Sequence, residues 1–168
     1  MSAGNVAADT SASKDAALRL AAGYDFALGD STLNVMGMVE SLGYTQENAT
    51  AGFKSYNRVA YLAGLKYRMG DHELRARYSA ALKPTIKAAD NTVLAAGAED
   101  QLGAQSFALG YAYFMSKNVQ VFAYYTQIMN EDRARYTFPV SGAANVVAGA
   151  TPAGSSPSAL GVGTRMSF

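Results

Sequence analysis

Charged side chains recur at every second position in stretches of this sequence that are otherwise apolar or small. In HELRARYSAAL, Glu73, Arg75 and Arg77 alternate with apolar residues. Side chains of an extended strand point alternately to its two faces, so these charges share one face. Guanidinium and ammonium groups along a narrow passage favour anions. The charged residues that alternate in this way are Arg19, Asp25, Arg58, Lys66, Arg68, Glu73, Arg75, Arg77 and Arg165.

No residues are arranged for catalysis or for binding a cofactor or metal. His72 is the single histidine; we expect a solvated turn residue, because no serine is placed to form a nucleophilic pair with it. Gly161 and Gly163 form no phosphate-binding loop, because no helix follows them. The stretches 45–55 and 90–100 carry too few carboxylates for a hard cation. We predict a protein that is not an enzyme and that uses no cofactor or metal.

Composition restricts the class of protein further. The net charge of +1 gives no electrostatic case for nucleic acid, and the absence of Cys removes disulfides and thiolate metal sites. No run of about 18 apolar residues offers a membrane-spanning helix. The mean hydropathy is −0.02, with 16 Gly and 11 Tyr. These values are typical of a transmembrane β-barrel, in which outward apolar and inward polar residues cancel in the average.

Seven stretches show the period of two that a strand requires. They are residues 16–28, 32–44, 56–69, 72–82, 104–114, 119–130 and 158–168. Three short turns join them in pairs, at Gly29-Asp30, Gly70-Asp71 and Ser116 to Asn118. Three long polar loops form the other connections, at 45–55, 83–103 and 131–157. The predicted fold is therefore all-β, an antiparallel meander of about seven strands.

The length of these strands and their connections point to a membrane. Outer-membrane barrels have short turns on one side and long loops on the other, and strands of about 9–11 residues suffice to cross. A charge facing lipid near the bilayer centre costs about 2–4 kcal/mol, which explains why charges avoid the apolar face. A soluble β-sandwich would show the same alternation, but not the alternating loop lengths. We therefore predict a pore lined by Arg19, Arg58, Lys66, Arg68, Glu73, Arg75, Arg77 and Arg165.

Two strands have an uncertain register. In 32–44, placing Glu40 on the charged face leaves Leu33, Val35 and Val39 outside, although the face of Met36 is nearly as apolar. In 119–130 both faces are apolar, so either register is open. A slip of one residue would exchange the two faces of a strand.

Three segments together resemble a known family. They are GDHELRARYSAAL, then LGAQSFALGYAYFMSKNVQVFAYYTQIMNEDRARYTF, then ALGVGTRMSF at the end. In this order they resemble the C-terminal part of Gram-negative outer-membrane general porins of the β-proteobacterial type, with Met115 as a small departure at the Ser-Lys turn. The resemblance implies a 16-stranded trimeric barrel for passive diffusion. It also implies that the terminal Phe168 is part of the signal read by the barrel-assembly machinery.

The resemblance sets the expected organisation of the chain. Residues 1–15 would be a polar loop remnant, without the features of a signal peptide, and 16–168 the C-terminal part of the barrel. The strand count is odd, so an N-terminal part of the parent would be missing, with the constriction loop.

The expected function is a passive outer-membrane channel for small hydrophilic solutes and ions, with anion preference. Expected partners are outer-membrane lipid, the assembly machinery and two further copies in a homotrimer of the full-length parent, but no nucleic acid. The four cations Lys66, Arg68, Arg75 and Arg77 should form the strongest anion-attracting patch, with only Glu73 close enough to offset them. Two alternatives stay open. The inward cations could pair with acids on the missing wall, or the chain could be an autonomous small β-barrel or β-domain with a structural or adhesive role through its long loops.

Overall fold

The chain folds into one curved antiparallel sheet. The computed structural model describes residues 13–46, 53–88, 99–138 and 152–167. The elements are β1 (Ser13–Leu28), β2 (Ser31–Gln46), β3 (Phe53–Met69), β4 (His72–Ala81), β5 (Thr85–Ala88), the short 3₁₀ helix η1 (Glu99–Gln101), β6 (Ala104–Phe114), β7 (Val119–Asn130) and β8 (Ser158–Met166). The strand order is β1-β2-β3-β4-β6-β7-β8, with every pair antiparallel, and β5 pairs with β3. The predicted seven-strand meander is confirmed.

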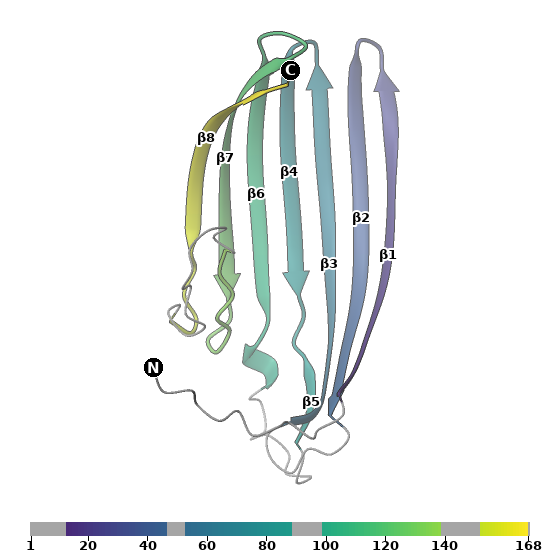
Figure 1. Ribbon diagram of the computed structural model, residues 1–168, viewed down its shortest axis with the longest axis vertical. Helices are drawn as coiled ribbons and strands as arrows, with labels where there is room; N and C mark the ends of the chain where they lie inside the picture. The colour runs from purple at the N-terminus through teal and green to yellow at the C-terminus, as the bar shows by residue number, and fades with distance from the viewer. Residues whose placement is uncertain (1–12, 47–52, 89–98, 139–151, 168) are drawn as a thin grey trace, which may run out of the picture.

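The short turns lie at one end of the sheet. Figure 1 shows the β1–β2, β3–β4 and β6–β7 turns together there, near the end of β8. Gly29 and Gly70 have φ of 62° and 56°, a backbone region that glycine enters without steric cost. At the third turn the Ser116 amide donates to the Val119 carbonyl at 3.2 Å. The three turns predicted from the sequence are confirmed.

The apolar face of the sheet is uncovered. Leu160 and Val162 on β8 are 76% and 78% exposed, and Leu18, Leu65 and Leu109 are also exposed. Among the described residues no second sheet packs on this face. Exposing an apolar surface of this extent to water is unfavourable, whereas contact with lipid stabilises it. The part of the chain that the structure describes is therefore a single-layered sheet and not a two-layered sandwich.

No helix in the described ranges is long and apolar enough to cross a membrane.

The pairing registers settle which residues share a face. Arg19 on β1 lies opposite Glu40 on β2, and the Asn34 amide donates to Asp25 Oδ1 at 2.7 Å. Glu40 therefore lies on the charged face, the face of Arg19, which settles the register of 32–44 that the sequence left open.

On β7 the structure decides between the two registers that the sequence left open. Phe122 and Tyr124 lie opposite Gly163 and Gly161 of β8, so these rings are on the charged face. A Cβ on Gly161 would stand 2.3 Å from the Tyr124 ring, because the ring lies over the glycine.

Several predicted boundaries differ from the structure. β2 ends at Gln46 and β3 begins at Phe53, so both strands extend into the predicted loop 45–55. β1 begins at Ser13, so residues 13–15 continue the strand, whereas residues 1–12 lie outside the described part. The stretch 83–103, predicted to be loop throughout, contains β5 and η1. Pro84 separates β4 from β5 because it has no amide hydrogen for the ladder, yet both strands pair with β3. Phe168 also lies outside the described residues.

Candidate functional site

The charged face of the sheet is the candidate site. Directly paired residues of antiparallel strands point to the same side, so the registers place all eight predicted residues on this face. Lys66, Arg68, Glu73, Arg75 and Arg77 come together on the adjacent strands β3 and β4. The other three stand apart: Arg19 on β1, Arg58 nearer the start of β3 and Arg165 on β8.

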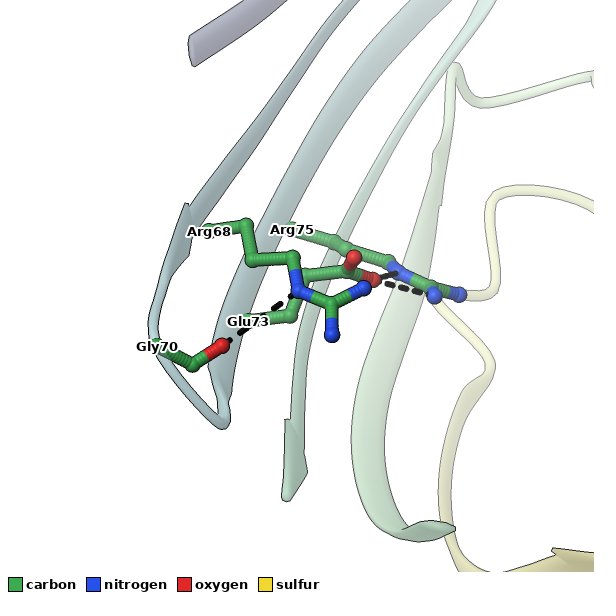
Figure 2. Close-up of polar contacts among 4 residues, drawn as sticks. All are labelled: Arg68, Gly70, Glu73 and Arg75. Atoms are coloured by element: carbon green, nitrogen blue, oxygen red, sulfur yellow. Dashed lines mark hydrogen bonds and ion pairs between the residues drawn. The ribbon is translucent and has the colours of Figure 1, made fainter. Parts of the chain in front are cut away.

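Glu73 and Arg75 form an ion pair on one strand. Arg75 donates from Nε to Glu73 Oε1 at 2.5 Å, and Glu73 is only 4% exposed. A buried carboxylate must be paired, because it has lost its water. Arg68 lies directly opposite Glu73, but its Nε contacts the Gly70 carbonyl at 3.4 Å, as Figure 2 shows. Its guanidinium stacks over the Phe114 ring with 4.1 Å to the ring centre.

Arg77 and Lys66 differ from their neighbours in having no polar partner in the part of the chain that the structure describes. Neither makes a hydrogen bond or ion pair with any other residue of the described ranges. Arg77 lies opposite Gly64 on β3 and Ala108 on β6, which offer no side-chain acceptor. Among the described residues Glu73 thus pairs with Arg75, whereas Lys66, Arg68 and Arg77 have no acidic partner. The anion-attracting role of the four-cation patch stays a prediction.

Arg19 and Arg58 are also engaged. Arg19 forms an ion pair with Glu40 across the β1–β2 pair. Arg58 donates from Nη1 to the Tyr136 hydroxyl and lies over the Tyr136 ring, 5.4 Å from its centre. Burial raises the pKa of Tyr136, and the nearby Arg58 charge only partly opposes this shift. The phenol is therefore a neutral acceptor for the guanidinium at physiological pH.

The segment Arg133–Phe138, here called the fastened segment, follows β7 and is held against the charged face by hydrogen bonds. Asn130 donates from Nδ2 to the Tyr136 carbonyl at 2.9 Å, and its Oδ1 accepts from the Tyr136 amide at 2.9 Å. The Tyr136 hydroxyl adds the contact to Arg58. Sequence reasoning assigned this segment to an external loop. The available signal was the pair Tyr136 and Phe138 in a loop otherwise made of small and polar residues.

A hollow of about 770 Å³ lies on the charged face. Lys66, Arg75 and Arg77 line it from β3 and β4, and Thr137 and Phe138 from the fastened segment. Its remaining wall includes Met36, Gly64, Ser106, Tyr124, Thr126 and Ile128. The site thus combines cations, hydroxyls and an apolar surface.

His72 stands on the opposite, apolar face. Its Nδ1 is 2.7 Å from the Tyr111 hydroxyl, and its ring packs beside Tyr113. The sequence predicted only a solvated turn residue, because the cross-strand neighbour on β6 was not visible. Within the described ranges no three His, Cys, Asp or Glu residues cluster for a metal.

Comparison with known proteins gives the family and the fold. The Gram-negative porin family matches residues 1–133. Among solved structures, the anion-selective porin from Comamonas acidovorans matches with a TM-score of 0.67 and 20% sequence identity. The match covers 93% of this chain and 40% of that one, so this chain spans well under half of that porin. Among proteins with curated descriptions none matches significantly.

Proposed function

Because this chain belongs to the Gram-negative porin family, we propose that it forms part of the wall of a channel through which small hydrophilic solutes and ions cross the outer membrane. Gram-negative porins are outer-membrane channels and not enzymes. One observation carries the proposal for this chain. A single-layered sheet exposes apolar side chains on one face and carries most of its strand cations on the other, with Lys14 and Lys87 near the strand ends as exceptions.

The sheet is proposed to be one section of a larger closed barrel. β1 and β8 each have a partner on one side only within the described residues. Unpaired backbone groups in hydrocarbon cost several kcal/mol each, so a membrane barrel has to close. Residues 16–168 are assigned to the C-terminal part of that barrel, in keeping with the 40% coverage of the solved porin. A homotrimer, and recognition of Phe168 by the assembly machinery, belong to the same proposal.

An anion preference is the finer part of the proposal. It is supported by Lys66, Arg77 and Arg165, which have no acidic partner among the described residues. Walls of low dielectric focus the field of such charges into the passage. The solved porin is described as anion-selective, but at 20% identity that likeness supports the fold alone.

The test is a planar-bilayer recording of the complete barrel that carries this chain, in a potassium chloride gradient. We expect stable unitary conductance with a reversal potential displaced toward that of chloride, and more displacement at low salt because screening is weaker. A purified, folded barrel without conductance would overturn the channel proposal. Conductance with a reversal potential toward potassium would overturn the anion preference alone.

A further inference from the structure

We propose that the hollow between the charged face and the segment Arg133–Phe138 binds a small aromatic carboxylate, which deepens and rests on the proposed channel function. The hollow, of about 770 Å³, is larger than such a molecule requires and lies in the size range of small-ligand pockets. Its lining divides into a cationic part and an apolar part. A ligand with a carboxylate at one end and a ring at the other matches both parts.

The cationic part consists of Lys66 and Arg77. The register places Arg77 opposite Gly64, two residues from Lys66 on β3, so the two cations are diagonal neighbours. Diagonal neighbours on paired strands stand about 7–8 Å apart, a separation that one carboxylate can bridge with two long cationic side chains. Neither cation is engaged by another described residue. Arg77 can therefore donate its guanidinium fork to a ligand carboxylate without breaking a polar contact to any described residue.

The apolar part is formed by Tyr124 and Ile128 on β7, Met36 on β2 and Phe138. Gly110 and Ala108 on β6 stand directly beside Arg75 and Arg77, and their small size leaves room above the sheet. The Tyr124 ring lies over Gly161 and is thereby fixed in position. An aromatic ring prefers such a surface of rings and aliphatic groups to water.

The fastened segment makes the hollow a preformed site. Asn130 holds the Tyr136 backbone through two hydrogen bonds of 2.9 Å, and Arg58 holds the Tyr136 hydroxyl. Thr137 and Phe138 follow directly and reach the same hollow as Lys66 and Arg77. A wall held in place before binding lowers the entropy lost when a ligand is ordered.

This combination selects one class of anion. An inorganic ion can use the cations and hydroxyls but not the apolar wall, and a neutral aromatic can use the apolar wall and hydroxyls but not the charge. An aromatic carboxylate uses both at once.

The experiment measures block of the potassium chloride current through the complete barrel by benzoate, acetate and benzamide. We expect half-block by benzoate at about a tenfold lower concentration than by acetate, equivalent to about 1.4 kcal/mol, and no comparable block by the neutral benzamide. Arg77→Gln and Phe138→Ala should each reduce the difference between benzoate and acetate. Arg165→Gln is the matched control: it removes an unpartnered cation on the same face outside this hollow, and should leave that difference unchanged.

Saturation-transfer NMR on the barrel in detergent provides a second measurement that does not depend on conduction. We expect transfer from the protein to the benzoate ring, lost in Phe138→Ala. Equal block by benzoate and acetate together with no ring transfer would overturn the site while leaving an anion-selective channel intact. Ring transfer without any conductance would support the site and overturn the channel proposal. Block that persists in both Arg77→Gln and Phe138→Ala would place the binding elsewhere and overturn the inference.

Discussion

The Arg75 guanidinium donates to the carboxylate of Glu73, two residues earlier on the same strand, at 2.5 Å. Residues two apart on a strand share a face, so this contact needs no partner from another strand. The charge of Arg75 is therefore compensated by Glu73. Arg77, the next residue on that face of β4, has no such acceptor among the described residues.

Replacing Glu73 should strengthen the anion preference. Glu73→Gln removes the carboxylate that compensates Arg75, so the wall gains one uncompensated cation. The reversal potential in a potassium chloride gradient should move toward chloride, more at low salt because screening extends over about 10 Å at 0.1 M. Glu40→Gln is the comparison, since Glu40 compensates Arg19 away from this cluster. An unchanged reversal potential in Glu73→Gln at low salt would show that Arg75 finds another acceptor.

Replacing Arg77 should have the opposite effect. Arg77→Gln removes one of the two uncompensated cations of the hollow, so the reversal potential should move toward potassium at low salt. Arg77→Lys keeps the charge and should remain close to the native value. If Arg77→Gln leaves the selectivity unchanged, then Arg77 is neutralised in the complete barrel by a residue of the remaining wall.

A side chain at Gly161 should displace the Tyr124 ring. A Cβ at this position would stand 2.3 Å from the Tyr124 ring, so Gly161→Ala must displace that ring, at a cost of about 1–3 kcal/mol. Gly37→Ala is the matched control, because its nearest contact would be 3.9 Å. Thermal unfolding in detergent, followed by gel mobility, should show a lower midpoint for Gly161→Ala only. Adding Tyr124→Ala should recover part of the loss, and no recovery would refute the ring as its cause.

Tyr136 should determine how firmly the segment Arg133–Phe138 is held. Tyr136→Phe removes the hydroxyl that Arg58 contacts, an interaction with a charged group worth about 1.5–3 kcal/mol. We expect larger current fluctuations in single-channel recordings of the variant, with Tyr24→Phe as the tyrosine control, because Tyr24 is exposed on the apolar face of β1.

The same residue predicts a pH dependence. Burial raises the pKa of Tyr136, so the folded state favours the neutral phenol relative to the unfolded chain. The contribution of Tyr136 to the free energy of unfolding is complete below the ordinary tyrosine pKa of about 10. It is lost as the pH rises through the raised pKa of the folded state. The current fluctuations in single-channel recordings of the native protein should therefore increase only in strongly alkaline solution. An increase that begins near neutral pH would contradict this assignment.

The sequence by itself determined the meander, the tight turns and the face of each charged residue on the clearly alternating strands. These features are local: alternation with period two assigns a side chain to a face, and Gly29 and Gly70 allow the positive φ of a two-residue turn. For this reason the charged set from Arg19 to Arg165 could be read without a fold. The family resemblance came from the same local segments.

Tertiary structure alone decided three further features. The register of β7 was open because both of its faces are apolar, and it is settled by Gly161 and Gly163 on the neighbouring strand, which accept the rings of Tyr124 and Phe122. Which cation Glu73 compensates depends on side-chain geometry, since Arg68 and Arg75 are both in reach by position. Tyr136 contacts both Asn130 and Arg58, which is 72 positions before Asn130 in the sequence. No local pattern specifies a contact over that separation, because only the folded sheet brings these side chains together.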